Sequence, residues 1–461
     1  MDATVARETF YAAQARHRRA ARRWLLLIGG IVLALVSVVG ILLAPPIYAL
    51  IGLLLDVVDR IAWAPDLLGW VAATIDALAN GAVPPALRVV GVLALAALPG
   101  FLLLMLGWWR LGRLEQAHEA ALARALGLRE PRTTDVEERQ FANVVAEMAI
   151  AAGCPLPGVR ILDVDAVNLG VFGDGAEAVL FATRGALAHL SRDHTQALAG
   201  QLVASLVDGD GRLAERIVRL TELLGLVVLV AQAPLSSIVR RTLRPLLGWR
   251  APGEETAATI RRALADPLDF FARHETAEDR AQDSKPGWRE WLLMPLMGSA
   301  LVGAVIVPIA TTFLLGPLLG LLWRRRRLLA DATAVRLTRN PQALAEAYLA
   351  CMGQRTTLGD KAPWLVHLFA LDVAPAPLLK LVSPYPPWRK RIARLVAQGA
   401  IVELPAAPPF SWMPIVVGVP LFALVGTLMA IAVVLSIWLT VALNMLFLAL
   451  PAALLHAVLR A

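Results

Sequence analysis

Between Pro405 and Leu459 the chain contains no Asp, Glu, Lys or Arg, and this uncharged stretch is the strongest constraint on its fold. A helix needs about 20 consecutive apolar residues to cross the hydrocarbon core of a bilayer. The stretch is long enough for a hairpin of two such helices, and 58% of all 461 residues are hydrophobic. The sequence therefore predicts an integral membrane protein.

Further apolar runs lie nearer the N-terminus. Trp24–Ala44, Val89–Trp109 and Trp291–Trp323 are expected to cross the membrane, while Leu223–Val239 is a shorter uncharged run. We expect the first run to be a retained anchor, because a secretory signal peptide has a shorter apolar core followed by a cleavage site with small residues. About six transmembrane helices are expected in all.

The charge distribution indicates the orientation of these helices. The net charge is +8, from 44 Lys and Arg against 36 Asp and Glu, and the Arg clusters flank apolar runs. Positive charge beside a span marks its cytoplasmic side, so we expect a bacterial inner-membrane protein with a cytoplasmic N-terminus. The lipid bilayer accounts for the basic character, and we expect no binding of nucleic acid.

Two polar segments are expected to form one cytoplasmic α+β domain that membrane segments interrupt. The expected divisions are a membrane region at 1–110, half-domains at 111–213 and 324–402, a membrane pair with a polar insert at 214–323, and a C-terminal transmembrane hairpin at 403–461.

The number of crossings between the half-domains must be even if they lie on one side. Two crossings are preferred here, although they place Arg240, Arg241 and Arg244 on the outer, disfavoured side. In the alternative, Leu223–Val239 only dips into the membrane and the later run forms a tight hairpin. The sequence leaves this choice open.

Local patterns predict several elements of the polar domain. Thr134-Asp135-Val136-Glu137 has the form of a capping box and opens a helix that Gly153 ends. Gly158–Asp163 and Glu177–Thr183 are rich in β-branched and apolar residues and are expected to be strands. Asp193–Asp210 is expected to be an amphipathic helix that ends in a turn.

Four segments resemble the HtpX and CAAX prenyl protease family of membrane zinc endopeptidases, and the resemblance covers roughly residues 1–400. Val144–Pro157 is similar to the helix and turn before the first strand, and Val167-Asn168 together with Thr183-Arg184-Gly185 is similar to turns around the family's edge strand. Leu329–Pro341 resembles the helix with the third zinc ligand, and Pro386-Pro387 with Arg391-Ile392 resembles a His-Pro-Pro-x-x-x-Arg-Ile segment. The resemblance implies a zincin-like fold.

The chemistry of that family is missing at the matching positions. An HExxH helix supplies two His ligands to zinc and a Glu that activates the bound water, and a second helix supplies the third ligand. Aligned on the Asp208-Gly209-Asp210 turn and on Asp331, the resemblance places other residue types there. In chain order, the first His, the catalytic Glu, the second His, the Glu ligand and the His of the His-Pro-Pro segment become Gln201, Leu202, Ser205, Arg327 and Tyr385.

These replacements predict no catalytic residue, no metal and no cofactor. Arg327 is expected to point toward Gln201 and Ser205, with its charge balanced by Asp331, and so to join the two halves that zinc joins in the family. The alternative is that Arg327 ends a basic run and reaches lipid headgroups.

We expect the protein to bind peptides although it lacks the catalytic residues. The resemblance implies an edge strand that holds an extended substrate by backbone hydrogen bonds. The resemblance assigns this role to the strand residues Val179, Leu180, Phe181 and Ala182.

Together these features favour a catalytically dead membrane metallopeptidase homologue. It would act as a scaffold, adaptor or client-binding protein, with a membrane protease or client membrane proteins as partners in protein quality control. The alternative is an active membrane zinc metalloendopeptidase with an atypical site, which would need zinc. A transporter is disfavoured because charged residues inside the spans are absent. The sequence leaves the client and the oligomeric state open.

Overall fold

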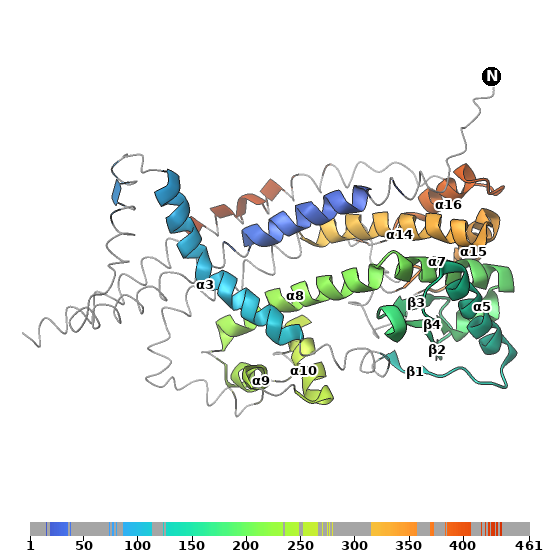
Figure 1. Cartoon of the computed structure of the whole chain (residues 1–461), viewed down its shortest axis with the longest axis horizontal. Helices are drawn as coiled ribbons and strands as arrows, with labels where there is room; N and C mark the ends of the chain where they lie inside the picture. Colours follow the sequence, from blue (N-terminus) through green and yellow to red (C-terminus); the bar gives the residue numbers. More distant parts are fainter. Residues whose placement is uncertain are drawn as a thin grey trace, which may run out of the picture. The chain divides into compact units, whose positions relative to one another are not determined.

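The structure is a computed structural model, and Figure 1 shows its elements. It describes residues 19–35, 86–112, 126–233, 236–248, 252–265, 315–356, 369–372 and 385–406, with single positions elsewhere. The first part of the run Trp291–Trp323 up to Leu314 and most of the C-terminal hairpin lie outside the described residues. The chain divides into two compact units, each made of segments that are distant in sequence: unit 1 is 1–29, 115–218 and 314–411, and unit 2 is 30–114, 219–313 and 412–461.

Unit 1 contains the four strands and most of the shorter helices. Its elements are β1 (Leu128–Arg129), α5 (Val136–Ala152), β2 (Gly158–Leu162), β3 (Leu169–Phe172), the 3-10 helix η2 (Gly175–Glu177), β4 (Val179–Thr183), α6 (Arg184–His189), α7 (Arg192–Val207), α14 (Gly316–Thr338), α15 (Pro341–Cys351) and α16 (Trp388–Ala397). Unit 2 contains α3 (Ala86–Gly112), α9 (Ser237–Leu247) and α10 (Glu254–Ala265). Helix α8 (Asp210–Gln232) begins in unit 1 and continues into unit 2.

The strands form one mixed sheet in the order β1-β2-β4-β3. β2 and β4 are parallel, and Gly158 pairs with Val179 at one end and Leu162 with Thr183 at the other. β3 runs antiparallel to β4 on its other side. Both sides of β4 therefore carry ladder hydrogen bonds, and the expectation that β4 is an edge strand is wrong.

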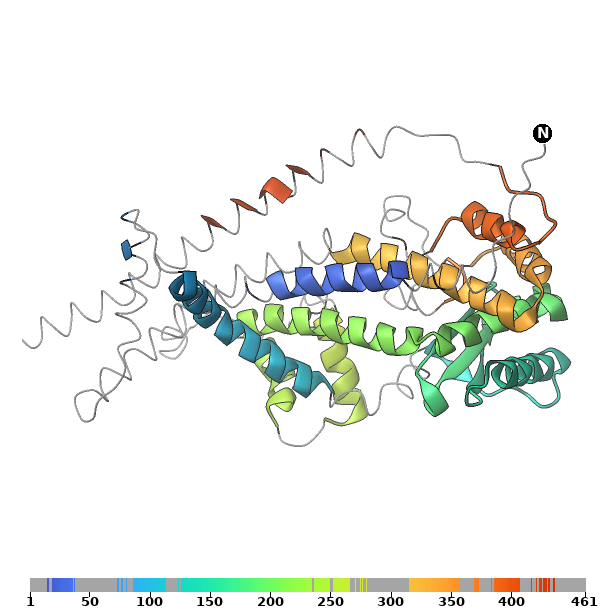
Figure 2. The ribbon, with the colours of Figure 1, turned by 45° about the horizontal axis from the view of Figure 1, so that its top comes forward.

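Helix α7 lies at the centre of unit 1. It contacts α5, α14 and α15, and Figures 1 and 2 show α5 and the strands beside it. All six residues from Gly200 to Ser205 are buried, which is the pattern of a helix packed on every side. Leu198, Leu202 and Val203 join Phe141 of α5 and Val335 of α14 in one apolar core.

The predicted end of α5 at Gly153 is confirmed, whereas its N-cap is Asp135 and not Thr134, the first residue of the capping-box pattern. Asp135 caps α5 by accepting hydrogen bonds from the backbone N–H groups of Glu137 and Glu138. Gly153 ends the helix with φ 66°, a left-handed conformation that glycine adopts without the steric cost of a Cβ. Gly209, with φ 77°, follows α7 in the same way.

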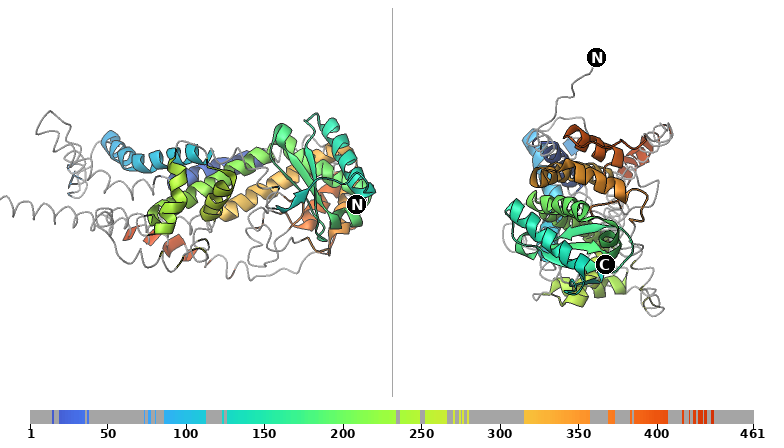
Figure 3. Two further views of the ribbon diagram at one scale, coloured as in Figure 1. Left: turned by 90° about the horizontal axis from the view of Figure 1, so that it is seen from below. Right: turned by 90° about the vertical axis from the view of Figure 1, so that its right-hand side faces the viewer.

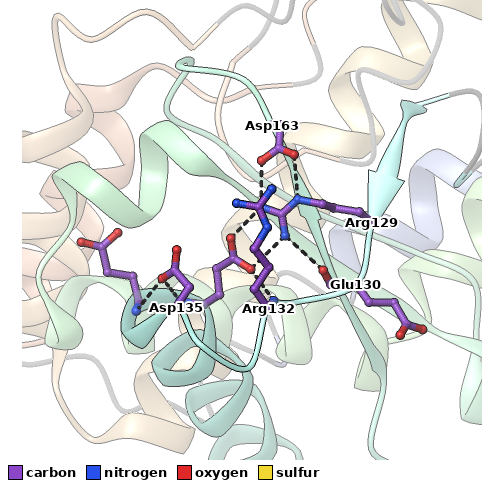
Figure 4. Close-up of polar contacts among 7 residues, drawn as sticks. Arg129, Glu130, Arg132, Asp135 and Asp163 are labelled. Atoms are coloured by element: carbon purple, nitrogen blue, oxygen red, sulfur yellow. Dashed lines mark hydrogen bonds and ion pairs between the residues drawn. The ribbon is translucent and has the colours of Figure 1, made fainter.

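An ion cluster fixes β1 to the rest of the sheet. The Arg129 guanidinium donates to both Asp163 oxygens at 2.7 and 2.8 Å and to both Glu138 oxygens at 2.9 and 2.6 Å. Figure 4 shows Arg129 pointing toward Asp163 at the end of β2. The backbone N–H of Arg132 also donates to Glu138 at 2.6 Å, and Glu138 is only 1% exposed. Charge-assisted bidentate pairs of this kind are among the stronger polar contacts in proteins.

This cluster predicts a loss of stability in acid. Hydrogen bonds from Arg129 lower the pKa of both Glu138 and Asp163, against the opposing effect of burial. The carboxylates therefore stabilise the fold above about pH 5, and this contribution disappears as the pH falls through their folded-state pKa values. We expect Glu138→Gln to be less stable than wild type at neutral pH and to show a flatter decline of the unfolding midpoint in acid. Glu130→Gln, whose side chain is 81% exposed, is the matched control and should titrate like wild type.

Unit 2 is helical throughout its described part. α3 exposes several large apolar side chains, including Phe101, Leu102 and Met105. The expected run Leu223–Val239 is not a single helix, because α8 ends at Gln232 and α9 begins at Ser237. Within the residues that the structure describes, no helix combines the length and the apolarity that a membrane crossing requires.

Candidate functional site

Helix α7 carries the three positions to which the resemblance assigns the first two zinc ligands and the base. Gln201 and Ser205 are four residues apart, so they lie on the same face of the helix. Gln201 is 0% exposed and Ser205 is 2% exposed. Leu202 belongs to the apolar core, so a packed side chain occupies the position of the catalytic Glu.

Ser205 is part of a chain of polar contacts from α7 to α14. Its hydroxyl donates to one oxygen of Asp210, and the Arg326 guanidinium donates to the other. Arg326 also donates to the carbonyl of Asp208, and the Thr333 hydroxyl donates to the Asp208 carboxylate at 2.9 Å. The turn after α7 is thereby fixed to α14 by contacts that use the hydroxyl of Ser205.

Arg327, to which the resemblance assigns the position of the third ligand, is buried at 2% exposure. Its guanidinium carbon lies 5.6 Å from the centre of the Tyr385 ring, within the range of a cation–π contact. Burial raises the pKa of Tyr385, while the charge of Arg327 opposes this shift. The phenol therefore stays protonated and donates to the carbonyl of Phe369 at 3.2 Å. The burial of Arg327 argues against the alternative that it reaches lipid headgroups.

The Asp331 carboxylate, which is expected to balance the charge of Arg327, is bound by Arg391 and Tyr348. Its carboxylate accepts two hydrogen bonds from Arg391, at 2.9 and 2.6 Å, and one from the Tyr348 hydroxyl at 2.7 Å. Arg391 also donates to the carbonyl of Ala370 at 3.1 Å. Arg391 comes from the Arg-Ile part of the matching segment, and its guanidinium takes the place beside Asp331 that we assigned to Arg327.

The Gln201 amide differs from its neighbours. Among the described residues neither its oxygen nor its nitrogen has a hydrogen-bond partner, although both are buried. The expected hydrogen bond from Arg327 to Gln201 is therefore absent there, and the Ser205 hydroxyl is bound to Asp210. A buried amide without partners costs about 1–3 kcal/mol.

The donor set does not fit zinc. Structural and catalytic zinc sites use thiolate, imidazole or carboxylate ligands, whereas the three positions hold an amide, a hydroxyl and a guanidinium. The carboxylates near them are engaged, Asp210 with Arg326 and Asp331 with Arg391. No cluster of three His, Cys, Asp or Glu side chains occurs within the part of the chain that the structure describes.

The strand that lies beside the site is β3, which the sequence analysis missed. Its Gly170 forms an antiparallel bridge with Phe369, and the Leu169 carbonyl accepts from the N–H of Ala370 at 2.8 Å. The outer edge of β3 is thus occupied at this point by the chain itself. Phe369 is fully buried and packs edge-to-face on Phe181 with 5.5 Å between ring centres.

Asn168 fixes the same segment. Its side-chain oxygen accepts from the N–H of Leu371 at 3.2 Å, and its amide nitrogen donates to the carbonyls of Leu371 at 3.3 Å and Thr356 at 3.1 Å. The Asn168 amide therefore forms hydrogen bonds with both the N–H and the C=O of Leu371, as the backbone of a neighbouring strand would. The resemblance at Val167-Asn168 pointed to this position. The contacts of Asn168 with Thr356 and Leu371 could not be predicted, because these residues lie 188 and 203 positions away in the sequence and no local pattern encodes such a contact.

Of the four residues predicted to bind peptide, Leu180, Phe181 and Ala182 are buried inside the sheet. Their backbones already pair with β2 and β3. A peptide cannot add to β4, because strand addition requires unpaired N–H and C=O groups. The prediction that a peptide binds along β4 is therefore wrong.

Comparisons with known proteins support the resemblance. No protein-family model and no solved structure matches this chain. It is 26% identical to a protease HtpX homolog of Streptococcus gordonii over 271 residues, which cover 57% of this chain and 74% of the relative. A protease HtpX homolog of Tropheryma whipplei is 26% identical over 56% of this chain and 72% of its own length, and one of Dictyoglomus turgidum is 24% identical over 59% and 73%. The chain is a distant relative of the HtpX protease homologues over a little more than half of its length.

Proposed function

We propose that this protein is a hydrolytically inactive membrane relative of the HtpX proteases that acts as a scaffold. One observation carries the proposal: the three positions for zinc ligands hold Gln201, Ser205 and the buried cation Arg327. A positive side chain at the third position opposes a metal cation by charge, and neither of the other two is a zinc donor. Without the metal and the Glu, nothing in the site lowers the pKa of a water molecule.

The contacts around the site support a structural role. Arg326 and Thr333 of α14 bind the turn after α7, and Asp331 binds Arg391 of α16. The contacts of Arg326 and Thr333 join residues 116 and 125 positions apart in the sequence, and the contact of Asp331 with Arg391 joins residues 60 positions apart. We propose that hydrogen bonds and ion pairs between side chains of this chain replace the zinc–ligand bonds that stabilise the fold in the active proteases.

The proposed partners are a membrane protease or client membrane proteins in protein quality control. A protein that keeps the fold of a protease but lacks its catalytic residues can still bind such proteins. β4 pairs with a neighbouring strand on both sides, and Gly170 of β3 already pairs with Phe369. Because these backbone groups are occupied, a scaffold or adaptor is favoured over a protein that binds extended clients along the sheet.

We also propose a location in the bacterial inner membrane, with the N-terminus and unit 1 cytoplasmic. The mean hydropathy of +0.63 and the uncharged run Pro405–Leu459 support the membrane location. The exposed apolar side chains of α3 support it independently, because such a surface is unfavourable in water.

The test is proteolysis by the full chain purified in detergent. We expect no cleavage of an unfolded protein such as casein, with or without added zinc. Ser205→Ala should change nothing in this assay, since the Ser205 hydroxyl is held by Asp210, whose other carboxylate oxygen is bound by Arg326. Cleavage that a chelator abolishes would support the alternative, an active zinc endopeptidase with an atypical site. Cleavage that Ser205→Ala abolishes would reveal a serine hydrolase.

A further inference from the structure

Helices α14 and α16 bring positive side chains together in unit 1. Helix α14 continues from the end of the apolar run at Trp323 into Arg324 and Arg325. Helix α16 carries Lys390 and Arg394. The two helices contact each other, and both contact α15, as the orange and red-orange ribbons of Figure 3 show. We call Arg324, Arg325, Lys390 and Arg394 the basic cluster.

Contacts within unit 1 fix the helices that carry the basic cluster. The buried ion pair of Asp331 with Arg391 joins α14 to α16. Nearer the N-terminal end of α14, the Arg324 guanidinium donates to the carbonyl of Ser383 at 2.8 Å, shortly before α16 begins. Because these contacts hold the two helices at fixed positions, the four cations cannot move far apart.

The cations of the basic cluster act on one another through their charges. Partial burial lowers the pKa of Lys390, and the charges of the three Arg residues of the cluster lower it further. Lys390 and Arg394 are four residues apart and therefore lie on the same face of α16. Like charges at this spacing repel each other and destabilise a helix. The cluster by itself is thus unfavourable for the fold, and a bound anion relieves the repulsion.

Carboxylates of the chain do not neutralise the whole cluster. Burial lowers the pKa of Arg324, and the charge of Asp372 opposes this shift. Arg324 and Arg394 also have further contacts. Among the described residues, neither Arg325 nor Lys390 forms an ion pair, and Lys390 is exposed. The positive charge that remains for a ligand is therefore that of Arg325 and Lys390.

Two apolar runs of the sequence adjoin the basic cluster. Arg324 directly follows the first of them, which ends at Trp323. The guanidinium of Arg389 on α16 donates to the carbonyl of Pro405 at 2.9 Å, and Pro405 begins the C-terminal uncharged run. Positive side chains beside apolar runs are typical of the place where a chain passes from lipid headgroups into hydrocarbon.

Exposed apolar side chains lie in the same segment. Leu404, the residue before Pro405, is 42% exposed, and Ile401 is 88% exposed. The segment is held on unit 1 because the backbone N–H of Ile401 donates to the side chain of Gln342 at 2.7 Å. At the surface of a bilayer, apolar side chains enter below the headgroups while cations contact the phosphates. A free phosphate ion would leave Ile401 and Leu404 in water.

We propose that the basic cluster binds an anionic phospholipid, with the phosphate held by Arg325 and Lys390 and with Leu404 in the apolar layer beneath the headgroups. The bound lipid holds unit 1 against the membrane surface and relieves the repulsion within the cluster. The inference rests on the proposed membrane location and is independent of whether the zinc site is inactive.

The class of lipid is tested by thermal unfolding of the full chain in detergent. A ligand that binds the native state alone raises the unfolding midpoint. We expect phosphatidylglycerol to raise the midpoint by about 3–5 °C more than phosphatidylcholine does at the same concentration. Glycerol phosphate, which has the phosphate but no acyl chains, should leave the midpoint unchanged. Equal rises with both lipids would overturn the inference, and a rise with glycerol phosphate as large as that with phosphatidylglycerol would overturn a lipid as the ligand.

Two double variants with the same change of net charge make this test specific. Arg325→Gln/Lys390→Gln should lose more than half of the difference between the two lipids, because it removes the cations assigned to the phosphate. Arg139→Gln/Arg184→Gln removes two exposed cations from other parts of unit 1 and should retain the difference. An unchanged difference in Arg325→Gln/Lys390→Gln, or equal losses in both variants, would overturn the site.

Contact with the bilayer is tested by fluorescence quenching in vesicles of phosphatidylcholine and phosphatidylglycerol in equal parts. Cys154 and Cys351 are replaced by Ala, and a fluorophore is attached at Leu404→Cys or, as the reference site, at Ile150→Cys on α5, which is 82% exposed. We expect a nitroxide on the lipid headgroup to quench the label at Leu404→Cys more strongly than the label at Ile150→Cys. Equal quenching at both positions would argue against the contact and overturn it.

Fractionation of cells that produce the protein distinguishes a failure of this inference from a failure of the membrane location. Recovery of the full chain outside the membrane fraction would overturn the proposed location, and the lipid site with it. Recovery in the membrane fraction, together with no preference for phosphatidylglycerol in detergent, would overturn the lipid site alone.

Discussion

Arg391→Ala is expected to destabilise unit 1 by about 3–5 kcal/mol, the range found when one partner of a buried ion pair is removed. Arg391 and Asp331 are 2% and 3% exposed, and among the described residues the substitution leaves the Asp331 carboxylate with the Tyr348 hydroxyl as its one donor. The carbonyl of Ala370 loses its donor as well. The free energy of unfolding of the detergent-solubilised protein measures the effect.

Two variants make this prediction specific. Arg389→Ala changes an exposed residue of the same helix, α16, and should alter the stability by less than about 0.5 kcal/mol. Asp331→Ala/Arg391→Ala should be no less stable than either single variant, because it leaves no uncompensated charge. Equal effects of Arg389→Ala and Arg391→Ala, or additive losses in the double variant, would contradict the buried pair.

Arg327→Ala is expected to cost about 2 kcal/mol or more, as large buried side chains do when they are truncated. The substitution removes a fully packed side chain and its contact with the Tyr385 ring. Arg327→Lys should fall between Ala and wild type, because a Lys keeps the charge and loses the planar group that stacks on the ring.

Arg325→Ala is the control for this prediction, since Arg325 belongs to the same basic run of α14 and is only partly buried. Thermal unfolding of the three variants and wild type in one detergent gives the comparison. Small and equal shifts for Arg325→Ala and Arg327→Ala would show that Arg327 only ends a basic run.

Local signals in the sequence were sufficient for part of the fold. The capping pattern at 134–137 gave the start of α5 to within one residue and Gly153 gave its end, because capping chemistry depends on residues within one turn. β2 and β4 were found within two residues at each end from their β-forming composition. Alignment on the turn Asp208-Gly209-Asp210 placed Gln201 and Ser205 on one buried face of α7.

Pairing between distant residues could not be predicted in this way. β3 has four residues, and one of them is Gly170, so its β-forming composition is a weaker signal than that of β4. The choice between Arg327 and Arg391 as the partner of Asp331 depends on the approach of α16 to α14, and no local pattern encodes it. Proximity in sequence favoured Arg327, but tertiary packing selected Arg391.

The most direct test of the central claim is the zinc content of the purified full-length chain, measured by elemental analysis after exposure to zinc and removal of the excess. We predict far less than one zinc per chain, because Gln201, Ser205 and Arg327 supply no zinc ligand. A variant with Gln201→His, Leu202→Glu, Ser205→His and Arg327→Glu restores the ligand types and serves as the positive comparison. About one zinc per wild-type chain, lost in Gln201→Ala or Ser205→Ala, would contradict the account.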